Sequence, residues 1–510
     1  MSLNRRNFIG AGVAAALPGS LIAQVVGADA LPATALPLPT VPGLTKPSLL
    51  TDARPVASSL GLDPRIWNWR SGADHNGPMP ANYYEASLSE WPAFGPLPGD
   101  QSCDVVVIGG GLLGASAALH LAEVGLDVIV VEKDHIGSGA SGRNGGQLTP
   151  GLARWEAGTM AANLPPDEAR RLWRFASVEA MELIDSLSAR YDFQCDRKRG
   201  HITAALHPGH MGALVEGADA RRQLGDRAVR VIGPHEVQEY VRSHIYHGAT
   251  LDASGGQLQP LALLRGLVYG FVQQGGRVYD GTPVQEIEEG TDGTTIITER
   301  GTIKARRGVV LAVHSSTFRF LPEGSTTLPF VTYVAVTPQL PMPISELLPG
   351  DLPVYDTQFQ IDYYRAVRDN RLLFGGQGTG NSWSPRDVNN YLLERIRTVF
   401  PQWEQPALEY SWGGISDVTI NGATDSRKSA GKIPVYIVHG WSGHGVAQTV
   451  RIGKAISDDL TGRNDDFAML TQIEHGRIPL GNFLAPLVIP VAKGMFGIKA
   501  ALQPSDMVSF

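Results

Sequence analysis

Cysteine is nearly absent from this sequence, since Cys103 and Cys195 are the only two among 510 residues. Neither has other metal-ligand residue types at the spacing that zinc or iron–sulfur sites need, which argues against such a centre. An oxidising compartment would permit a disulfide between them. Because Cys103 begins an apolar, strand-like run, two structural thiols are favoured. Long basic runs are also missing and the formal net charge is -7, which argues against nucleic acid as a partner.

The first thirty residues have the pattern of an export signal. Arg5 and Arg6 precede an apolar, glycine- and alanine-rich run at 8–26, and a small-residue site follows at 28–30. This arrangement resembles a twin-arginine signal, which predicts recognition by the twin-arginine translocase and location in the periplasm. A retained membrane anchor is the alternative. Cleavage is favoured because the run is short for a membrane span and contains Pro18.

Residues 31–100 contain twelve prolines, which oppose regular helices and central strands. Two aromatic pairs in this stretch, Trp67 with Trp69 and Tyr83 with Tyr84, are too apolar for a free linker. We therefore expect an extended arm that packs these side chains onto the body of the protein. A loosely tethered spacer is the alternative.

A dinucleotide-binding pattern begins after residue 103. A β-branched run at 105–108 predicts a strand buried on both faces. GGGLLG at 109–114 fits G-x-G-x-x-G, and a helical pattern and a second strand at 127–131 follow it. The glycines permit a tight turn, a close approach of backbone N–H groups to a pyrophosphate, and close helix–strand packing, while the acidic residue after the second strand can accept from ribose hydroxyls. The predicted dinucleotide contacts are Gly109, Gly111, Leu112, Leu113, Gly114, Glu132 and Lys133.

A second glycine-rich loop, GSGASGRNGGQ at 137–147, follows the second strand. Its bare backbone can lie against a flat ring system, an approach that bulky side chains would block. Arg143 and Asn144 are the polar exceptions. They contact either a phosphate or the ring edge, or they hydrogen-bond the loop itself. The candidate contacts in this loop are Ser138, Ala140, Ser141, Arg143, Asn144, Gly145, Gly146 and Gln147.

Together with the first glycine motif, this loop resembles the FAD-binding signature of the D-amino acid oxidase-like superfamily, in particular of gamma-glutamylputrescine oxidase-type amine oxidases. The resemblance covers about residues 80–490, and four further stretches agree in the expected order. They are YYEAS at 83–87, CD at 195–196 with GHI at 200–202, YYR at 363–365 with RLLFGG at 371–376, and GWSGHG at 440–445. The resemblance implies an α/β fold in which a Rossmann-type FAD-binding domain is interleaved with an antiparallel-sheet substrate domain.

The implied boundaries assign each part of the chain to one of these domains. They place a signal peptide at 1–30, the proline-rich arm at 31–100, FAD-binding segments at 101–194, 251–324 and 421–475, substrate-domain segments at 195–250 and 325–420, and a C-terminal tail at 476–510. Alternating patterns also predict strands at 276–278 and 284–287, a hairpin of 294–297 with 301–304, and a separate buried strand at 308–313.

The resemblance also implies a reaction. Flavin takes hydride from the carbon that bears a neutral nitrogen in a small amine or amino acid, and the resulting imine hydrolyses. Residues 412–417 contain no cysteine, so the FAD is expected to be noncovalent. In some sarcosine oxidase-like relatives a lysine on the substrate sheet activates oxygen, but 329–334 contains none. The acceptor is therefore open between O2 and a quinone or carrier protein, and a non-catalytic flavin-binding accessory protein is a further alternative.

Three side chains are candidates for direct roles. His444 either helps to stabilise the reduced flavin or braces its loop. Arg365 either clamps a substrate carboxylate with its forked donors or is an ordinary strand arginine. Tyr364 is either a pocket wall or a core residue. The remaining cofactor contacts implied by the resemblance are Val284, Ala312, Gly440, Ser442, Gly443, His444 and Gly445.

The C-terminal run at 484–502 is apolar, although it contains Lys493 and Lys499. It is either a peripheral contact with a membrane or a packed terminal helix.

Overall fold

The computed structural model describes residues 41–54, 82–321, 326–380, 385–478 and 481–507. The predicted export signal and the Trp67–Trp69 pair of the arm lie outside these described residues. The chain divides into two units, Met1–Pro37 and Leu38–Phe510, and every described element belongs to the second. Both cysteines are buried and free within it, as expected for structural thiols.

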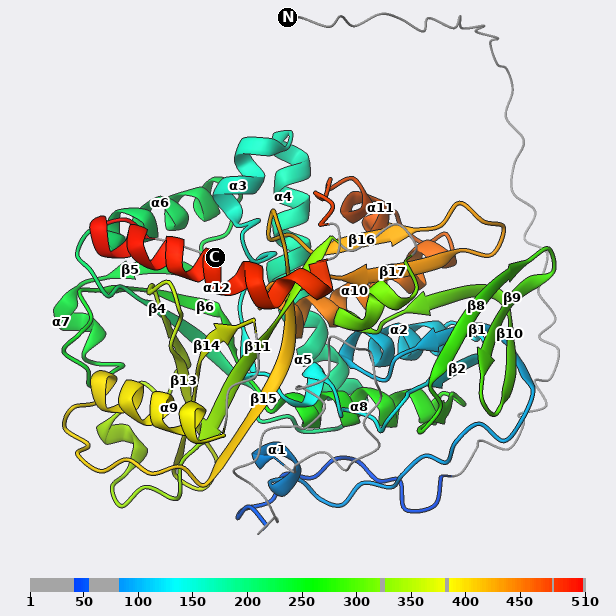
Figure 1. Ribbon diagram of the computed structural model, residues 1–510, viewed down its shortest axis with the longest axis horizontal. Coiled ribbons are helices and arrows are strands. Elements are labelled where there is room, and N and C mark those ends of the chain that lie inside the picture. The colour runs from blue at the N-terminus through cyan, green and yellow to red at the C-terminus, as the bar shows by residue number, and fades with distance from the viewer. Residues whose placement is uncertain (1–40, 55–81, 322–325, 381–384, 479–480, 508–510) are drawn as a thin grey trace, which may run out of the picture. The chain divides into compact units, whose positions relative to one another are not determined.

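The first sheet has a parallel centre (Figure 1), and the first glycine motif directly follows its strand β1. Val105, Val106 and Val107 of its central strand are fully buried, as a strand covered on both faces requires. An antiparallel strand closes one edge, and a hairpin extends from β10. In spatial order the strands are β16 (Asp425–Lys428), β17 (Val435–His439), β10 (Gly301–Leu311), β1 (Gln101–Ile108), β2 (Val128–Val131) and β7 (Arg277–Tyr279), with β8 (Val284–Gly290) and β9 (Gly293–Thr298) as the hairpin.

One strand of this sheet differs from the prediction. The segments 301–304 and 308–313 were expected to be separate strands, but β10 runs through both without a break. Arg306 and Arg307 interrupt the apolar pattern because their side chains are exposed. The first half of β10 pairs with β9 and the second half with β17, while β1 pairs along both.

The second sheet is built from nine strands, mostly antiparallel, and it confirms the predicted α/β fold with an interleaved second sheet. The boundary predicted at residue 250 falls inside β6, and the glycine-rich loop 137–147 ends as β3, so this loop joins the two sheets. In order the strands are β15 (Tyr410–Thr419), β11 (Thr327–Val336), β14 (Arg371–Thr379), β13 (Tyr363–Val367), β12 (Val354–Asp356), β4 (Lys198–Ala204), β6 (Ala249–Gln257) and β3 (Gln147–Leu148), with β5 (Val229–Ile232) beside β6.

Helices cover both sheets. α2 (Leu112–Glu123) packs against α8 (Pro260–Gln273) and α10 (Gly445–Leu460) beside the first sheet, and α9 (Pro385–Val399) packs on one face of the second. Tyr83 and Tyr84 are buried, so this part of the arm does pack on the body. The other helices are α1 (Tyr83–Ala86), α3 (Ala157–Asn163), α4 (Pro166–Arg174), α5 (Ala180–Arg190), α6 (His210–Gln223), α7 (Pro234–Val237), α11 (Asp466–Thr471) and α12 (Gly481–Leu502).

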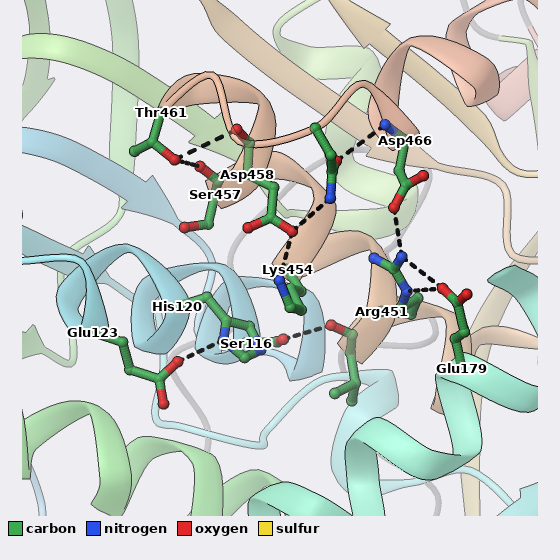
Figure 2. A network of polar contacts seen from close by, with 12 residues as sticks. Ser116, His120, Glu123, Glu179, Arg451, Lys454, Ser457, Asp458, Thr461 and Asp466 are labelled. Carbon is green, nitrogen blue, oxygen red and sulfur yellow. Dashed lines mark hydrogen bonds and ion pairs between the residues drawn. The ribbon is translucent and has the colours of Figure 1, made fainter. Parts of the chain in front are cut away.

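A polar network ties α2 to α10, and Figure 2 shows its contacts. The Ser116 hydroxyl of α2 donates to the Val450 carbonyl of α10 at 2.7 Å. A Cβ added at Gly453 would lie 2.7 Å from Ser116 Cβ, so the two helices approach too closely for any larger residue there. Arg451 of α10 donates to Glu179 at 2.8 Å. The Ser116 hydrogen bond and the close approach at Gly453 therefore hold α2 against α10, and each of these helices begins directly after a glycine-rich segment.

Candidate active site

A cavity of about 790 Å³ lies between the carboxyl ends of the first sheet's parallel strands and one face of the second sheet. It is lined by every predicted cofactor contact except Gly114 and Gly440, which lie behind its wall. Alternate residues of the second sheet face it: His201, Thr203, Tyr355 and Tyr363 line the cavity. Four of their strand neighbours, Ile202, Ala204, Val354 and Tyr364, belong to the core under α9.

At Gly109 and Gly114, the first glycine motif leaves no space for a side chain. Gly109 has a left-handed φ of +107°, and a Cβ added there would lie 2.4 Å from the Ala312 carbonyl oxygen. At Gly114, a Cβ would lie 2.0 Å from the Gly109 carbonyl oxygen, so the start of α2 touches the end of β1. Ser141 Oγ accepts from the Leu112 N–H at 2.9 Å, which joins the second loop to the first turn of α2. This bare helix start fits a pyrophosphate.

Glu132 stands at the end of β2 with its carboxylate turned to the same turn. It accepts from the N–H groups of Gly110 at 2.8 Å and Asp134 at 3.1 Å. Burial raises the pKa of Glu132, although these two donors oppose that shift. A carboxylate has room for about four donors, so two ribose hydroxyls would complete its hydrogen bonding. The residues present therefore fit a dinucleotide.

Side chains hold the second loop in place from within and from the second sheet. Asn144 donates to the carbonyls of Ala140 and Ser141, both at 3.1 Å, and accepts from the Gly146 N–H at 2.8 Å. Arg143, which is 4% exposed, donates from Nε to the Gly413 carbonyl at 2.7 Å. Of the two roles considered for these residues, the observed contacts are those that brace the loop.

The structure corrects the interpretation of Arg365. Its side chain is 1% exposed and does not line the cavity. Nε donates to the Gly145 carbonyl at 2.7 Å, and Nη2 donates to the Tyr84 hydroxyl at 3.3 Å. Gly146 lies so close that an added Cβ would be 2.6 Å from Nη2. Because the loop covers the guanidinium, Arg365 braces the loop and cannot clamp a substrate carboxylate.

The structure also corrects the candidate role of Tyr364 in the reaction. It neighbours Tyr363 on β13 and therefore points to the opposite face, away from the cavity. Its hydroxyl lies 2.7 Å from that of Tyr246, and its ring stacks on Phe374 with a centroid distance of 5.4 Å. Tyr364 is a core residue.

His444 lines the cavity at the start of α10. Its Nδ1 accepts from the Ala153 N–H at 3.1 Å, and burial lowers its pKa to about 4, so the ring is neutral at pH 7. Asp417 supports the same loop by accepting from the N–H groups of Gly440 and Trp441, both at 3.1 Å. The observed contact of His444 is the bracing one.

Several cavity residues were not anticipated from the sequence. Arg221 pairs with Asp226 at 2.8 Å and Asp252 at 2.6 Å, and these groups compensate one another. The Glu156 carboxyl also lines the cavity, where desolvation raises its pKa while Arg221 opposes that shift. Lys493 reaches the cavity from α12. These residues come from unconnected segments and share no local motif, so only the fold brings them together.

Comparison with known proteins gives consistent matches. The sequence matches the DAO family, FAD dependent oxidoreductase, over residues 104–459. Gamma-glutamylputrescine oxidoreductase of Escherichia coli K12 is 32% identical over 411 residues, which cover 79% of this chain and 94% of that protein. The probable oxidoreductase OrdL of Haemophilus influenzae is 30% identical over 422 residues, covering 80% of this chain and 95% of that protein.

Solved structures agree in fold. Glycine oxidase from Geobacillus kaustophilus superposes with a TM-score of 0.61 at 22% identity, covering 72% of this chain and 96% of that chain. L-proline dehydrogenase from P. horikoshii superposes with a TM-score of 0.60 at 18% identity, covering 73% and 96%.

Proposed function

Because the chain belongs to the DAO family of FAD-dependent oxidoreductases, we propose that it oxidises the C–N bond of a small amine or amino acid. Bound FAD, the cofactor of this family, supplies the two-electron oxidation itself. The observation that carries the proposal is a single cavity lined both by the two glycine-rich loops and by a polar face of the second sheet. Substrate and cofactor can therefore meet in one cavity.

The chain's own residues bind and orient the reactants. The start of α2 and Glu132 would hold the dinucleotide, and the loop 137–147, fixed by Asn144 and Arg365, would offer a bare surface to a flat ring. The Glu156 carboxyl lines the cavity and offers an acceptor to an amine nitrogen. α10 begins at the cavity wall, where its first N–H groups favour negative charge.

The test is anaerobic bleaching of the purified yellow protein by polyamines, N-methylated amines, and D- and L-amino acids. We expect at least one class to bleach the flavin absorbance. A protein purified without flavin would refute the cofactor, whereas a flavoprotein that no amine bleaches would favour the accessory role. Peroxide release in air during turnover would identify O2 as the acceptor, and its absence would favour a quinone or carrier protein.

We also propose that α12 lies on a membrane surface. Among the described residues, it is the one helix that by length and composition is long and apolar enough to cross a membrane, and 11% of Leu484–Leu502 is buried. Ala485 and Ile489 are held in the protein, so we place the helix along the bilayer surface and not across it. The exposed apolar residues are Leu484, Leu487, Val488, Val491, Met495, Ile498 and Leu502.

A protein bound in this way would reach a membrane quinone, which favours quinone as the second candidate acceptor. Cosedimentation with vesicles that contain phosphatidylglycerol measures the contact. The triple variant Leu487→Glu, Met495→Glu, Ile498→Glu should stay in the supernatant, and equal sedimentation of both proteins would exclude this surface.

We propose export to the periplasm by the twin-arginine translocase, supported by Arg5 and Arg6 before the apolar run. Replacing both with lysine should leave the protein in the cytoplasmic fraction of a host cell. An unchanged distribution would refute this route.

A further inference from the structure

The C-terminal helix α12 supplies part of the cavity wall, although it lies beyond the family match at residues 104–459. It packs against β11 and β14 of the second sheet (Figure 1). Ile489 and Lys493 line the cavity, and the Phe496 ring lies 5.5 Å from that of Phe359. One face of α12 therefore forms part of the site.

Lys493 of this helix contacts a β-bulge in β14. Thr332 pairs with Gly378 and Tyr333 with Gly376, which leaves Gln377 as the extra residue. Gln377 has a left-handed φ of +62°, a conformation uncommon for a residue with a side chain. Bulges next to active sites redirect side chains, and here the Gln377 side chain lines the cavity. Its Oε1 accepts from Lys493 Nζ, and the Gly378 carbonyl accepts from the same Nζ at 2.5 Å.

The charge of Lys493 has no acidic partner among the described residues. Burial lowers its pKa to about 8, so the ammonium form still predominates at pH 7. The titratable groups on β11 and β14 are Tyr333 and Arg371, and neither shifts this pKa. In the adjoining 356–362 segment, Asp362 pairs with Arg395 at 2.7 Å, and Asp356 accepts from backbone N–H groups.

An ammonium carries three N–H donors, and Gln377 and Gly378 accept from two of them. The third donor and the uncompensated charge are left for a ligand in the cavity. Lys493 is half-buried, and a charge that is partly withdrawn from water without a counter-ion is costly, so an anionic ligand group would remove that cost.

We propose that Lys493 binds a carboxylate of the substrate, so that the enzyme selects amines that carry an acidic group. This inference rests on the proposed function, because it names the class of substrate for the same cavity.

Binding of propionate, followed by the change in flavin absorbance of the holoprotein, tests the inference without turnover. We expect Lys493→Met to weaken propionate binding at least about tenfold, as loss of a hydrogen bond to a charged group predicts. Lys493→Arg should retain part of the affinity. Lys499→Met is the matched control, because Lys499 is exposed on the same helix, and it should bind as the wild type does. Wild-type affinity should fall as pH rises through about 8, and Lys493→Met should lose that dependence.

Equal propionate affinity in wild type and Lys493→Met, or no binding by the wild type, would overturn the assignment. Failure of every amine to bleach the flavin, with propionate binding that still depends on Lys493, would refute the proposed function alone. If Lys493→Met does not retain FAD, Lys493→Gln is measured in its place.

Discussion

Replacing Arg365 by methionine separates a residue that braces the cofactor loop from one that binds substrate. The guanidinium lies under the loop 137–147, where Nε donates to the Gly145 carbonyl at 2.7 Å and Nη2 to the Tyr84 hydroxyl at 3.3 Å. It also lies 6.0 Å from the centre of the Tyr84 ring. Methionine keeps most of the side-chain volume and removes all hydrogen-bond donors. The substitution therefore destabilises the loop and leaves the packing of the core largely unchanged.

The size of the effect follows from these contacts. A hydrogen bond from a charged donor contributes about 1.5–3 kcal/mol, and the part-buried Gly145 carbonyl would be left without that donor. We expect the free energy of unfolding to fall by about 3 kcal/mol. If the whole loss appears in cofactor binding, the Kd of FAD rises roughly 100-fold, since each 1.4 kcal/mol is a factor of ten.

Fluorescence titration of the apoprotein with FAD and thermal unfolding of the holoprotein measure both quantities. Arg368→Met is the matched control, because Arg368 lies nearby but is 40% exposed, and it should change neither quantity appreciably. Our reasoning would be wrong if Arg365→Met bound FAD like the wild type but raised KM tenfold for an amino acid and not for the corresponding amine. That result would restore the carboxylate clamp.

Three further variants test other parts of the site. Gly114→Ala should purify without FAD, because its Cβ would lie 2.0 Å from the Gly109 carbonyl oxygen; a normal flavin spectrum would contradict this. His444→Gln should reduce the acid sensitivity of the protein. Burial lowers the folded-state pKa of His444 from 6.5 to about 4, so the neutral ring contributes fully to the free energy of unfolding above pH 6.5. That contribution is lost at up to about 1.4 kcal/mol per pH unit as the pH falls towards 4, and urea unfolding can measure the loss. Tyr364→Phe removes the hydroxyl paired with Tyr246 and should cost about 1 kcal/mol in urea unfolding; a tenfold loss of kcat would place Tyr364 at the reaction.

The glycine motifs and their strands could be predicted because their constraints are local. The turn at Gly109 and the contact at Gly114 exclude side chains within one strand–turn–helix unit, so the sequence itself records the geometry. The continuity of β10 could not be predicted in the same way. Arg306 and Arg307 interrupt the apolar pattern, and the strand continues because β1 pairs with β10 on both sides of them, with a shift in register between Cys103 and Val105.

Arg365 and Tyr364 show where residue type misleads. An arginine next to two tyrosines on a predicted strand has the chemistry of a carboxylate site. Alternation on β13 indicates that Tyr363 and Arg365 share one face and Tyr364 lies on the other. It gives no information on what covers that face, and here the returning glycine-rich loop covers Arg365 while Tyr363 stays open to the cavity.

Lys493 illustrates the opposite case. The sequence contains a lysine for the cavity, but it lies on α12 and not on the sheet strand where a lysine was sought. The substrate sheet segment 329–334 has no lysine, and this left the site without a cation from that strand. On α12, Ala485, Ile489, Lys493 and Phe496 recur at spacings of three and four, which places them on one helical face. Ala485 and Ile489 are buried and Lys493 and Phe496 are half-buried, opposite an exposed apolar face, which indicates that the lysine points inward to a partner. The described partners are two neutral oxygen acceptors, so the charge itself remains available to a ligand.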